Sequence, residues 1–259
     1  KLTALGKILV IRFSSIGDIV LTTSFITTLK KTFRNFEIHY LTLDKFSSIL
    51  EFHPEIDRVI NLNSNSNLKS LLELNKFIKS SNYNRIFDLH GSIRSRLITK
   101  GIRRTISRVK KPRFMRLVLF QFHVNMFPSN FSAITMYHNC LEENQSKEFP
   151  KTYLSVSDLE QKNAIGFLKK NNVEGRFIAI VPGAAWPQKQ WGVAKYSKAI
   201  TEIISRSNKS VVLLGTEKDK INNEIEKINN QVVNLTGKTN LRQAMSILYL
   251  SDTVLGSDT

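Results

Sequence analysis

The sequence predicts an α/β protein made of two doubly wound domains. Apolar, strand-like runs alternate with amphipathic helical stretches from the N-terminus, the alternation breaks off, and it restarts at Phe177. Such alternation typically builds a parallel sheet with helices on both faces. We therefore assign residues 1–150 to one domain and 151–259 to a second. The second domain is expected to be incomplete here, because the chain stops shortly after its fourth expected strand.

In the first series, short runs rich in branched and aromatic residues alternate with stretches of helical periodicity. Strands are expected at residues 7–13, 38–43, 58–62 and 85–89, and helices at 18–33 and 68–80. Residues 92–146 are less regular. We expect an apolar-rich helix near residues 114–127, which either packs in the core or docks on lipid, and a further helix around 132–143.

The second series follows a connecting stretch, residues 148–175, that contains Pro150, a short extended piece and a helix rich in Lys and Asn. After that stretch the alternation is more regular than in the first half. Strands are expected at residues 177–181, 210–214, 232–235 and 254–255, and helices at 193–205, 218–229 and 241–250. The two halves thus repeat one architecture without a visible sequence repeat.

The composition excludes several classes of protein. The 259 residues are 41% hydrophobic, and the longest apolar patch, residues 117–122, is too short to span a bilayer. The start does not resemble a signal peptide, and it begins at Lys1 rather than Met, so we expect a trimmed N-terminus. A single cysteine, Cys140, excludes an internal disulfide and a Cys-based zinc site. It fits a reducing cytoplasm and is expected to be buried as a small hydrophobe.

The chain carries a formal charge of +17, a field that attracts nucleic acid, anionic membranes or phosphorylated substrates. Ten Lys or Arg and no acidic residue fall between Arg94 and Arg116. This is a local basic patch, and the plain alternative is a solvated surface. A nucleic-acid-binding function is disfavoured, because few aromatic residues are interleaved for base stacking and no recognised motif is present.

Asp18 follows the first strand, where a helix begins. One interpretation is an N-cap, whose carboxylate accepts backbone N–H bonds. The other is a general base at the carboxyl end of a strand, the edge at which open α/β sheets bind ligands. Gly17 beside it allows the backbone to approach a ligand closely. The sequence leaves both interpretations open.

A second strand–loop–helix segment, residues 177–191, has the sequence FIAIVPGAAWPQKQW. Its loop carries Gly183 and Lys189, which could neutralise a phosphate or diphosphate group together with backbone N–H groups. Lys189 could equally be a solvated surface residue. Neither the dinucleotide fingerprint nor the P-loop motif occurs in this segment.

Other candidates follow later strands. Glu217 or Asp219 could accept a ribose hydroxyl, and Asp258 with Thr259 could bind sugar hydroxyls, although helix capping is a fair alternative. His90 is a possible substrate contact. No cluster of carboxylates or histidines suggests a metal site.

Five segments in order resemble the heptosyltransferase-type glycosyltransferases, often called family 9. They are KILVIRFSSIGDIVLTT, FDLHGSIRSR, IAIVPGAAWPQKQWGVAKYSKAI, VVLLGTEKD and LGSDT. The resemblance implies the GT-B architecture, two Rossmann-like domains facing a central cleft, of which the first binds acceptor and the second donor. It implies inverting, metal-independent transfer of a heptose from ADP-heptose to the lipopolysaccharide inner core, with no cofactor.

By position, the resemblance assigns the base to Asp18 and the donor-phosphate contact to Lys189. The remaining donor-binding positions are Pro182, Gly183, Ala184, Glu217, Asp258 and Thr259. Acceptor-binding positions are Ser15, Gly17, His90, Arg94 and Arg96. Some members carry hydroxyl residues where this chain has Ala184 and Ala185, so backbone N–H groups would have to replace them. The family's Asp-Thr-Gly motif is cut after Thr259.

The implied partners are a nucleotide-sugar donor and an anionic, lipid-linked sugar acceptor, with no nucleic acid. The implied location is the cytoplasm, with possible peripheral contact at the inner membrane. Two alternatives remain on this scaffold: transfer of another nucleotide-sugar to a different glycan, and an inactive truncated homologue.

Overall fold

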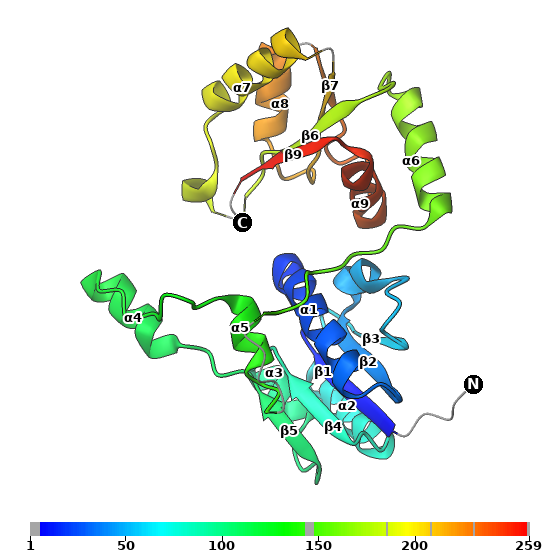
Figure 1. The fold of residues 1–259 in the computed structure, drawn as a ribbon, viewed down its shortest axis with the longest axis vertical. Helices are drawn as coiled ribbons and strands as arrows, with labels where there is room; N and C mark the ends of the chain where they lie inside the picture. Colours follow the sequence, from blue (N-terminus) through cyan, green and yellow to red (C-terminus); the bar gives the residue numbers. More distant parts are fainter. Residues whose placement is uncertain (1–5, 143–147, 185, 208, 230, 258–259) are drawn as a thin grey trace. The chain divides into compact units, whose positions relative to one another are not determined.

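The protein was analysed as a computed structural model that describes residues 6–142, 148–184, 186–207, 209–229 and 231–257 (Figure 1). The chain divides into two compact units, Lys1–Ser155 and Val156–Thr259. Each unit is a parallel sheet covered by helices, so the predicted α/β class with two doubly wound sheets is confirmed.

The sheet of the first unit has five parallel strands in the order β3-β2-β1-β4-β5. The strands are β1 (Gly6–Ile11), β2 (Phe36–Leu43), β3 (Arg58–Leu62), β4 (Arg85–Asp88) and β5 (Thr105–Arg108). The central strand β1 is completely buried from Ile8 to Ile11, as expected for a strand covered on both faces.

The described residues of the first unit form five α-helices, most of which pack on the two faces of that sheet. They are α1 (Ile16–Thr32), α2 (Leu68–Ser80), α3 (Ile93–Ile98), α4 (Arg113–Phe122) and α5 (Ala133–His138), with the 3₁₀ helix η1 (Asp44–Leu50) after β2. α2 and α3 pack on one face through Leu71, Ile78 and Ile98. On the other face, Phe25 of α1 makes an edge contact with Phe87 of β4.

The second unit has four parallel strands among its described residues, in the order β8-β7-β6-β9. The elements are α6 (Asp158–Lys170), β6 (Phe177–Val181), η2 (Pro187–Lys189), α7 (Val193–Arg206), β7 (Ser210–Leu213), α8 (Ile221–Ile228), β8 (Val232–Asn234), α9 (Leu241–Leu250) and β9 (Thr253–Gly256). α6 and α9 pack on one face of the sheet and α7 and α8 on the other, which Figure 1 also shows.

Both sheets have a point at which the strand order reverses. In the first unit it lies between β1 and β4, and in the second between β6 and β9. Ligands of open α/β sheets bind outside the carboxyl ends of the strands at such a switch point. The loops after these four strands are therefore where a site is expected in each unit.

The element predictions were correct for most of the chain, and the differences lie at element ends and in the irregular stretch 92–146. The first helix starts at Ile16 rather than at residue 18, because Ser15 occupies the N-cap position. β5 and α3 lie in the stretch that sequence periodicity left unassigned. The apolar helix expected near residues 114–127 is α4, which ends at Phe122, since His123 adopts a left-handed conformation. Cys140 is buried, as predicted.

Candidate functional site

Asp18 lies in the first turn of α1, directly after the central strand of the first unit. The backbone N–H of Ser15 donates to Asp18 Oδ2 at 3.2 Å, and the Ser15 hydroxyl donates to the same oxygen at 3.0 Å. Ser15 is the N-cap of α1, so the N-cap interpretation of Asp18 is wrong: Asp18 is the third residue of the helix, and its carboxylate completes a capping box by accepting the N–H of Ser15. Its role as a general base stays a prediction. Ser15 and Gly17 are exposed in the same turn.

Two further residues bind the Asp18 carboxylate. Tyr137 of α5 donates its hydroxyl to Oδ1 at 2.7 Å, and the Arg12 guanidinium forms an ion pair with Oδ2. Arg12 is only 6% exposed, and it also donates to the carbonyl of Leu89 at 2.8 Å. Its guanidinium lies 5.5 Å from the centre of the Tyr137 ring. The first strand, the loop after β4 and α5 thus converge on this carboxylate.

These contacts decide the protonation state of Asp18. Burial raises the pKa of Asp18, but the Tyr137 hydrogen bond, the charge of Arg12 and the hydrogen bonds from Ser15 outweigh it, so the pKa lies below the ordinary 3.8. Asp18 is consequently ionised at neutral pH. About a third of its side chain (32%) is exposed, which leaves the carboxylate accessible to a ligand at the strand edge.

The loop after β4 is organised by Asp88, which is completely buried. Its carboxylate accepts the backbone N–H of His90 at 3.2 Å and that of Gly91 at 2.8 Å, and the hydroxyl of Ser95 at 2.8 Å. Gly91 has a φ of 59°, a conformation that favours glycine. These bonds hold the loop after β4 in one conformation. His90 therefore has a defined position on the β4 side of the switch point, whereas Asp18 lies on the β1 side.

His90 is half-buried against the ring of Phe13, with ring centroids 4.8 Å apart. Burial, with the positive charges of Arg12 and Lys111, lowers the pKa of His90 to about 4. Its Nδ1 atom is buried and has no hydrogen-bond partner among the described residues. His90 is therefore a neutral imidazole at physiological pH, close enough to Arg12 and Asp18 for their charges to act on it.

A basic hollow opens beside this loop, with a volume of about 470 Å³. The cationic side chains on its wall come from α3, β5, the segment that leads into α4 and the first residue of α4. They are Arg96, Arg108, Lys110, Lys111 and Arg113. Burial and the charges of Arg12 and Arg113 lower the pKa of Lys111. Arg94, on the same helix as Arg96, is exposed but is not part of this wall.

In the second unit, the loops after β6 and β7 lie against each other. A Cβ placed on Gly183 would collide with the carboxylate of Asp219, so a larger residue here would require the Asp219 side chain to move. Asp219 accepts the backbone N–H of Thr216 at 2.6 Å and its hydroxyl at 2.9 Å. Asp219 thus holds a turn, whereas Glu217 is exposed and lies against Gly237 of the loop after β8.

Ser257 connects the other two elements at this edge. Its hydroxyl donates to the carbonyl of Pro182 at 2.8 Å and shares a hydrogen bond of 2.8 Å with the hydroxyl of Tyr196. The ends of β6 and β9 and the helix α7 are thereby joined at the switch point. Asp258 and Thr259, which follow Ser257, lie outside the described residues.

A second hollow, of about 480 Å³, lies beside these loops. Its wall includes Ala184, Trp191, Lys218 and Asp219. It also includes Gly192 and Lys220, the N-cap residues of α7 and α8, and neither helix start has a side-chain cap. The positive end of a helix dipole favours a negatively charged ligand. Lys189 is exposed at the end of η2, three residues before Gly192.

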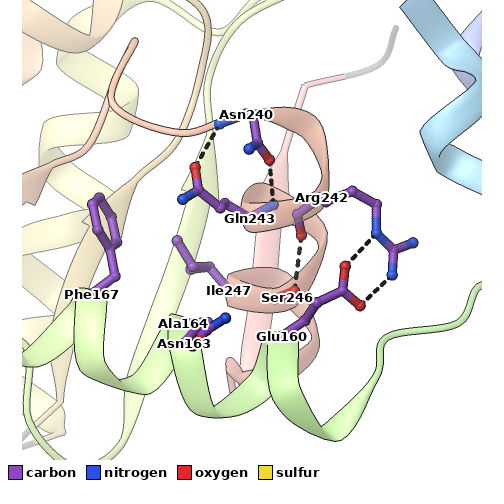
Figure 2. A pocket seen from close by; sticks show the side chains of 9 residues that line it. All are labelled: Glu160, Asn163, Ala164, Phe167, Asn240, Arg242, Gln243, Ser246 and Ile247. Carbon is purple, nitrogen blue, oxygen red and sulfur yellow. Dashed lines mark hydrogen bonds and ion pairs between the residues drawn. The ribbon is translucent and has the colours of Figure 1, made fainter. Parts of the chain in front are cut away.

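A third pocket lies between α6 and α9 (Figure 2). Arg242 donates to both carboxylate oxygens of Glu160, at 2.7 and 2.5 Å. These bonds lower the pKa of Glu160 to about 2, although its partial burial acts in the opposite direction. Glu160 also accepts the N–H and hydroxyl of Ser157 at 2.8 Å, which caps α6. The pair satisfies its own charges, so we interpret it as a clamp between two helices.

Sequence reasoning missed the residues that position the candidates, namely Arg12, Asp88, Tyr137 and Ser257. A signal was present for two of them. Arg12 and Asp88 are charged residues at the ends of apolar strands, and charges are almost never buried without a partner. Tyr137 and Ser257 carried no such signal, because their contacts join segments that are distant in sequence. Asp18 and Lys189 belong to different units, and the central cleft predicted between the two domains stays a prediction.

Within the described ranges, no three His, Cys, Asp or Glu side chains gather as metal ligands would. None of the described helices combines the length and the apolar character needed to cross a bilayer.

Comparison with known sequences identifies relatives. The chain is 34% identical to lipopolysaccharide heptosyltransferase 1 of Campylobacter coli over 103 residues, which cover 38% of this chain and 29% of that protein. It is 24% identical to lipooligosaccharide heptosyltransferase 2 of Haemophilus influenzae over 270 residues, which cover 97% of this chain and 78% of that protein. The chain thus spans less than a third of the first relative and over three quarters of the second.

Solved structures share the fold. The glycosyl transferase family 9 protein from Veillonella parvula superposes with a TM-score of 0.80 at 18% identity, covering 97% of this chain and 75% of that one. E. coli ADP-heptose lps heptosyltransferase II superposes with a TM-score of 0.71 at 22% identity, covering 98% and 79%. The family model described as glycosyltransferase family 9 (heptosyltransferase) matches residues 71–259. With most of its length matched by that model, the chain belongs to glycosyltransferase family 9, the heptosyltransferase family.

Proposed function

We propose that this chain is an inverting glycosyltransferase that moves a heptose from ADP-heptose to the inner core of lipopolysaccharide. The observation that carries the proposal is the Asp18 carboxylate, which is ionised and accessible at the switch point of the first unit. Family membership and the names of the two heptosyltransferase relatives support the sugar class.

Asp18 is the base in this proposal. The acceptor hydroxyl oxygen forms a bond to the anomeric carbon, the bond from that carbon to the ADP oxygen breaks, and the hydroxyl proton passes to Asp18. A carboxylate with a low pKa is a weak base for a free hydroxyl. The hydroxyl becomes far more acidic as its oxygen bonds to carbon, so the proton leaves late. Tyr137 and Arg12 hold the carboxylate in place until then.

The leaving diphosphate is assigned to the second unit. Lys189 supplies one positive charge, and the hollow at the starts of α7 and α8 supplies the positive ends of two helix dipoles together with Lys218. Pro182, Gly183 and Ala184 form the loop over which the diphosphate would lie, and Glu217 would accept a ribose hydroxyl. Fixed cations and dipoles of this kind stabilise negative charge as it develops in the transition state. We therefore propose a metal-independent reaction, with Asp258 and Thr259 contributing to donor binding.

The acceptor that fits the first unit is an anionic, lipid-linked sugar. Arg96 lies on the wall of the basic hollow and Arg94 is exposed on the same helix, and guanidinium groups bind carboxylates and phosphates through paired hydrogen bonds. Neutral His90, with Ser15 and Gly17, lies at the edge near Asp18, where the attacking hydroxyl would be held. Binding of such an acceptor would bring the protein to a membrane surface.

The test is ADP release by the purified protein with an acceptor of the lipopolysaccharide inner core. A panel of nucleotide-sugars replaces ADP-heptose in parallel reactions, and a chelator is added to one series. We expect turnover with ADP-heptose that the chelator leaves unchanged. Turnover only with another nucleotide-sugar would contradict the assigned donor, and loss of turnover with chelator would contradict metal independence.

A further inference from the structure

The helix α4 exposes an unusually apolar surface. No residue of α4 is buried. Phe114, Leu117 and Phe120 follow one another at a spacing of three residues, so they lie along one face of the helix. They are 68%, 60% and 80% exposed. Figure 1 shows α4 standing off the sheet of the first unit, connected to it by extended segments.

The apolar surface continues past the end of the helix. Phe122, Val124 and Met126 are 67%, 53% and 49% exposed. We call this set, from Phe114 to Met126, the α4 surface. Soluble proteins rarely leave so many large hydrophobic side chains exposed in one continuous segment, and such a patch marks an interaction site.

The charge around the α4 surface is entirely positive. Arg113 and Arg116 are exposed on α4 itself, and Lys110 and Lys111 immediately precede it. No acidic residue occurs anywhere between Asp88 and Glu142. A helix with exposed aromatic residues beside Arg and Lys, and no acidic residue, has the composition of helices that lie in the interface of an anionic bilayer.

Apolar and basic side chains also occur together in the hollow beside α4. A hollow of about 360 Å³ is lined by Met115 of α4 together with Phe131 and Met136, and Arg108 and Lys110 are also on its wall. The inner side of the helix therefore leaves space rather than closing a tight core. α4 follows a basic segment, residues 108–111, and packs extensively against no other described helix or strand of the first unit.

We propose that the α4 surface docks on an anionic lipid bilayer, with the helix lying in the plane of the interface. The aromatic and aliphatic side chains enter the headgroup region, and the flanking arginines pair with lipid phosphates. A second copy of the chain is a poorer occupant. Two-fold pairing through this surface would oppose two clusters of like charge without an acidic residue to balance them.

This inference deepens the proposed function by naming the surface that would hold the protein at a lipid-linked acceptor, and it rests on that proposal only for its biological meaning. Binding of bare vesicles needs neither donor nor acceptor. Failure of vesicle binding therefore overturns the α4 proposal alone, and failure of ADP-heptose turnover overturns the proposed function alone.

The experiment is sedimentation with phosphatidylcholine vesicles, with and without phosphatidylglycerol. We expect binding only when phosphatidylglycerol is present, weakened by added salt because the lipid phosphates and the arginines are screened. The triple variant F114S/L117S/F120S should bind at least about tenfold more weakly, because three apolar side chains no longer leave water. Removal of one charge in R116Q should weaken binding less than the triple variant.

The matched control is L68S/L72S on α2, which removes exposed leucines (62% and 46% exposed) from a helix that, unlike α4, also carries an acidic residue, Glu73. It should bind vesicles as the unchanged protein does. As a second readout, the triple variant should keep turnover of an acceptor freed of its acyl chains and lose turnover of the same acceptor in vesicles.

Three results would overturn the proposal. One is equal binding of neutral and anionic vesicles. Another is unchanged vesicle binding by F114S/L117S/F120S, which would mean that the overall positive charge of the protein, and not the α4 surface, attracts it to the vesicles. The last is a shift from dimer to monomer in analytical ultracentrifugation caused by the triple variant with no change in vesicle binding, which would make the α4 surface an interface between copies.

Discussion

The hydroxyl of Tyr137 donates a hydrogen bond of 2.7 Å to Oδ1 of Asp18, although the two residues are 119 positions apart in the chain. Tyr137 itself is almost completely buried in α5. Burial also raises the pKa of the Tyr137 hydroxyl, so it acts as a donor throughout the physiological range. The candidate base is therefore oriented by a helix that sequence motifs did not connect with it.

Replacing Tyr137 by Phe removes this donor while keeping the ring. The pKa of Asp18 should then rise towards its ordinary value of 3.8, because a hydrogen bond to the ionised form is lost. The acid limb of the pH–rate profile should move to higher pH in Y137F, and turnover near neutral pH should fall moderately. Y83F, which deletes another buried hydroxyl, one that bonds to His39, is the control and should leave the profile in place. An unchanged acid limb in Y137F would argue against this positioning role.

Asp18→Asn removes the proposed base and keeps the size of the side chain. We expect turnover to fall by about 10²–10⁴, the usual contribution of a positioned base, with the fold intact by circular dichroism. Asp44→Asn is a matched control, since Asp44 also accepts bonds at the start of a short helix, from Lys45 and Ser64. Near-normal turnover in D18N would remove Asp18 from the base role.

Lys189→Ala tests the donor side. Loss of one fixed group that stabilises developing negative charge should lower the rate by about 10²–10³. The effect should appear in kcat for ADP-heptose more than in acceptor binding. Lys195→Ala removes an equally exposed charge from the nearby helix α7 and should have little effect. Equal losses in the two variants would indicate a general charge effect and not a specific contact.

His90 makes stability depend on pH. Its pKa of about 4 in the folded protein lies below the ordinary value of 6.5, mainly because of burial. The unfolded chain therefore takes up a proton that folded His90 does not, and the free energy of unfolding falls as the pH drops through 6.5 towards 4. Urea unfolding at pH 7 and pH 5 should show a smaller pH-dependent loss in His90→Gln. Direct NMR titration of His90 near pH 6.5 would contradict this account.

Arg242→Gln breaks the clamp between α6 and α9. Charge-assisted hydrogen bonds of this kind contribute about 1.5–3 kcal/mol, so the variant should be destabilised by that order. With the pKa of Glu160 lowered to about 2 from 4.5, the contribution is complete above pH 4.5 and is lost as the pH falls towards 2. Thermal unfolding at pH 7 and pH 3 measures both effects. Arg206→Gln, in an exposed pair with Glu202, should cost less than about 1 kcal/mol.

Periodicity predicted α2, α9, β3 and β6 to the residue, and it placed the bounds of α1, β1 and β2 within two residues. Periodicity missed β5, because its sequence TISR has only one apolar residue. This segment is a strand because it pairs in parallel with β4 at the edge of the sheet. The same limit applies to the site. Asp18, Lys189 and Gly183 were proposed as candidates because they follow apolar strands, whereas Tyr137 contacts Asp18 and Ser257 contacts Pro182 from elsewhere in the fold.

The sequence by itself determined the α/β class, the family and the loops after β1 and β6 as the candidate site, because apolar periodicity and motif order are local properties of the chain. Only the tertiary structure decided which groups hold the Asp18 carboxylate, and that His90 is neutral, because burial and pairing depend on residues that meet through folding. The position of α4 was decided in the same way. An apolar helix pattern alone does not distinguish a core helix from an exposed one, and here no other element covers it among the described parts of the first unit.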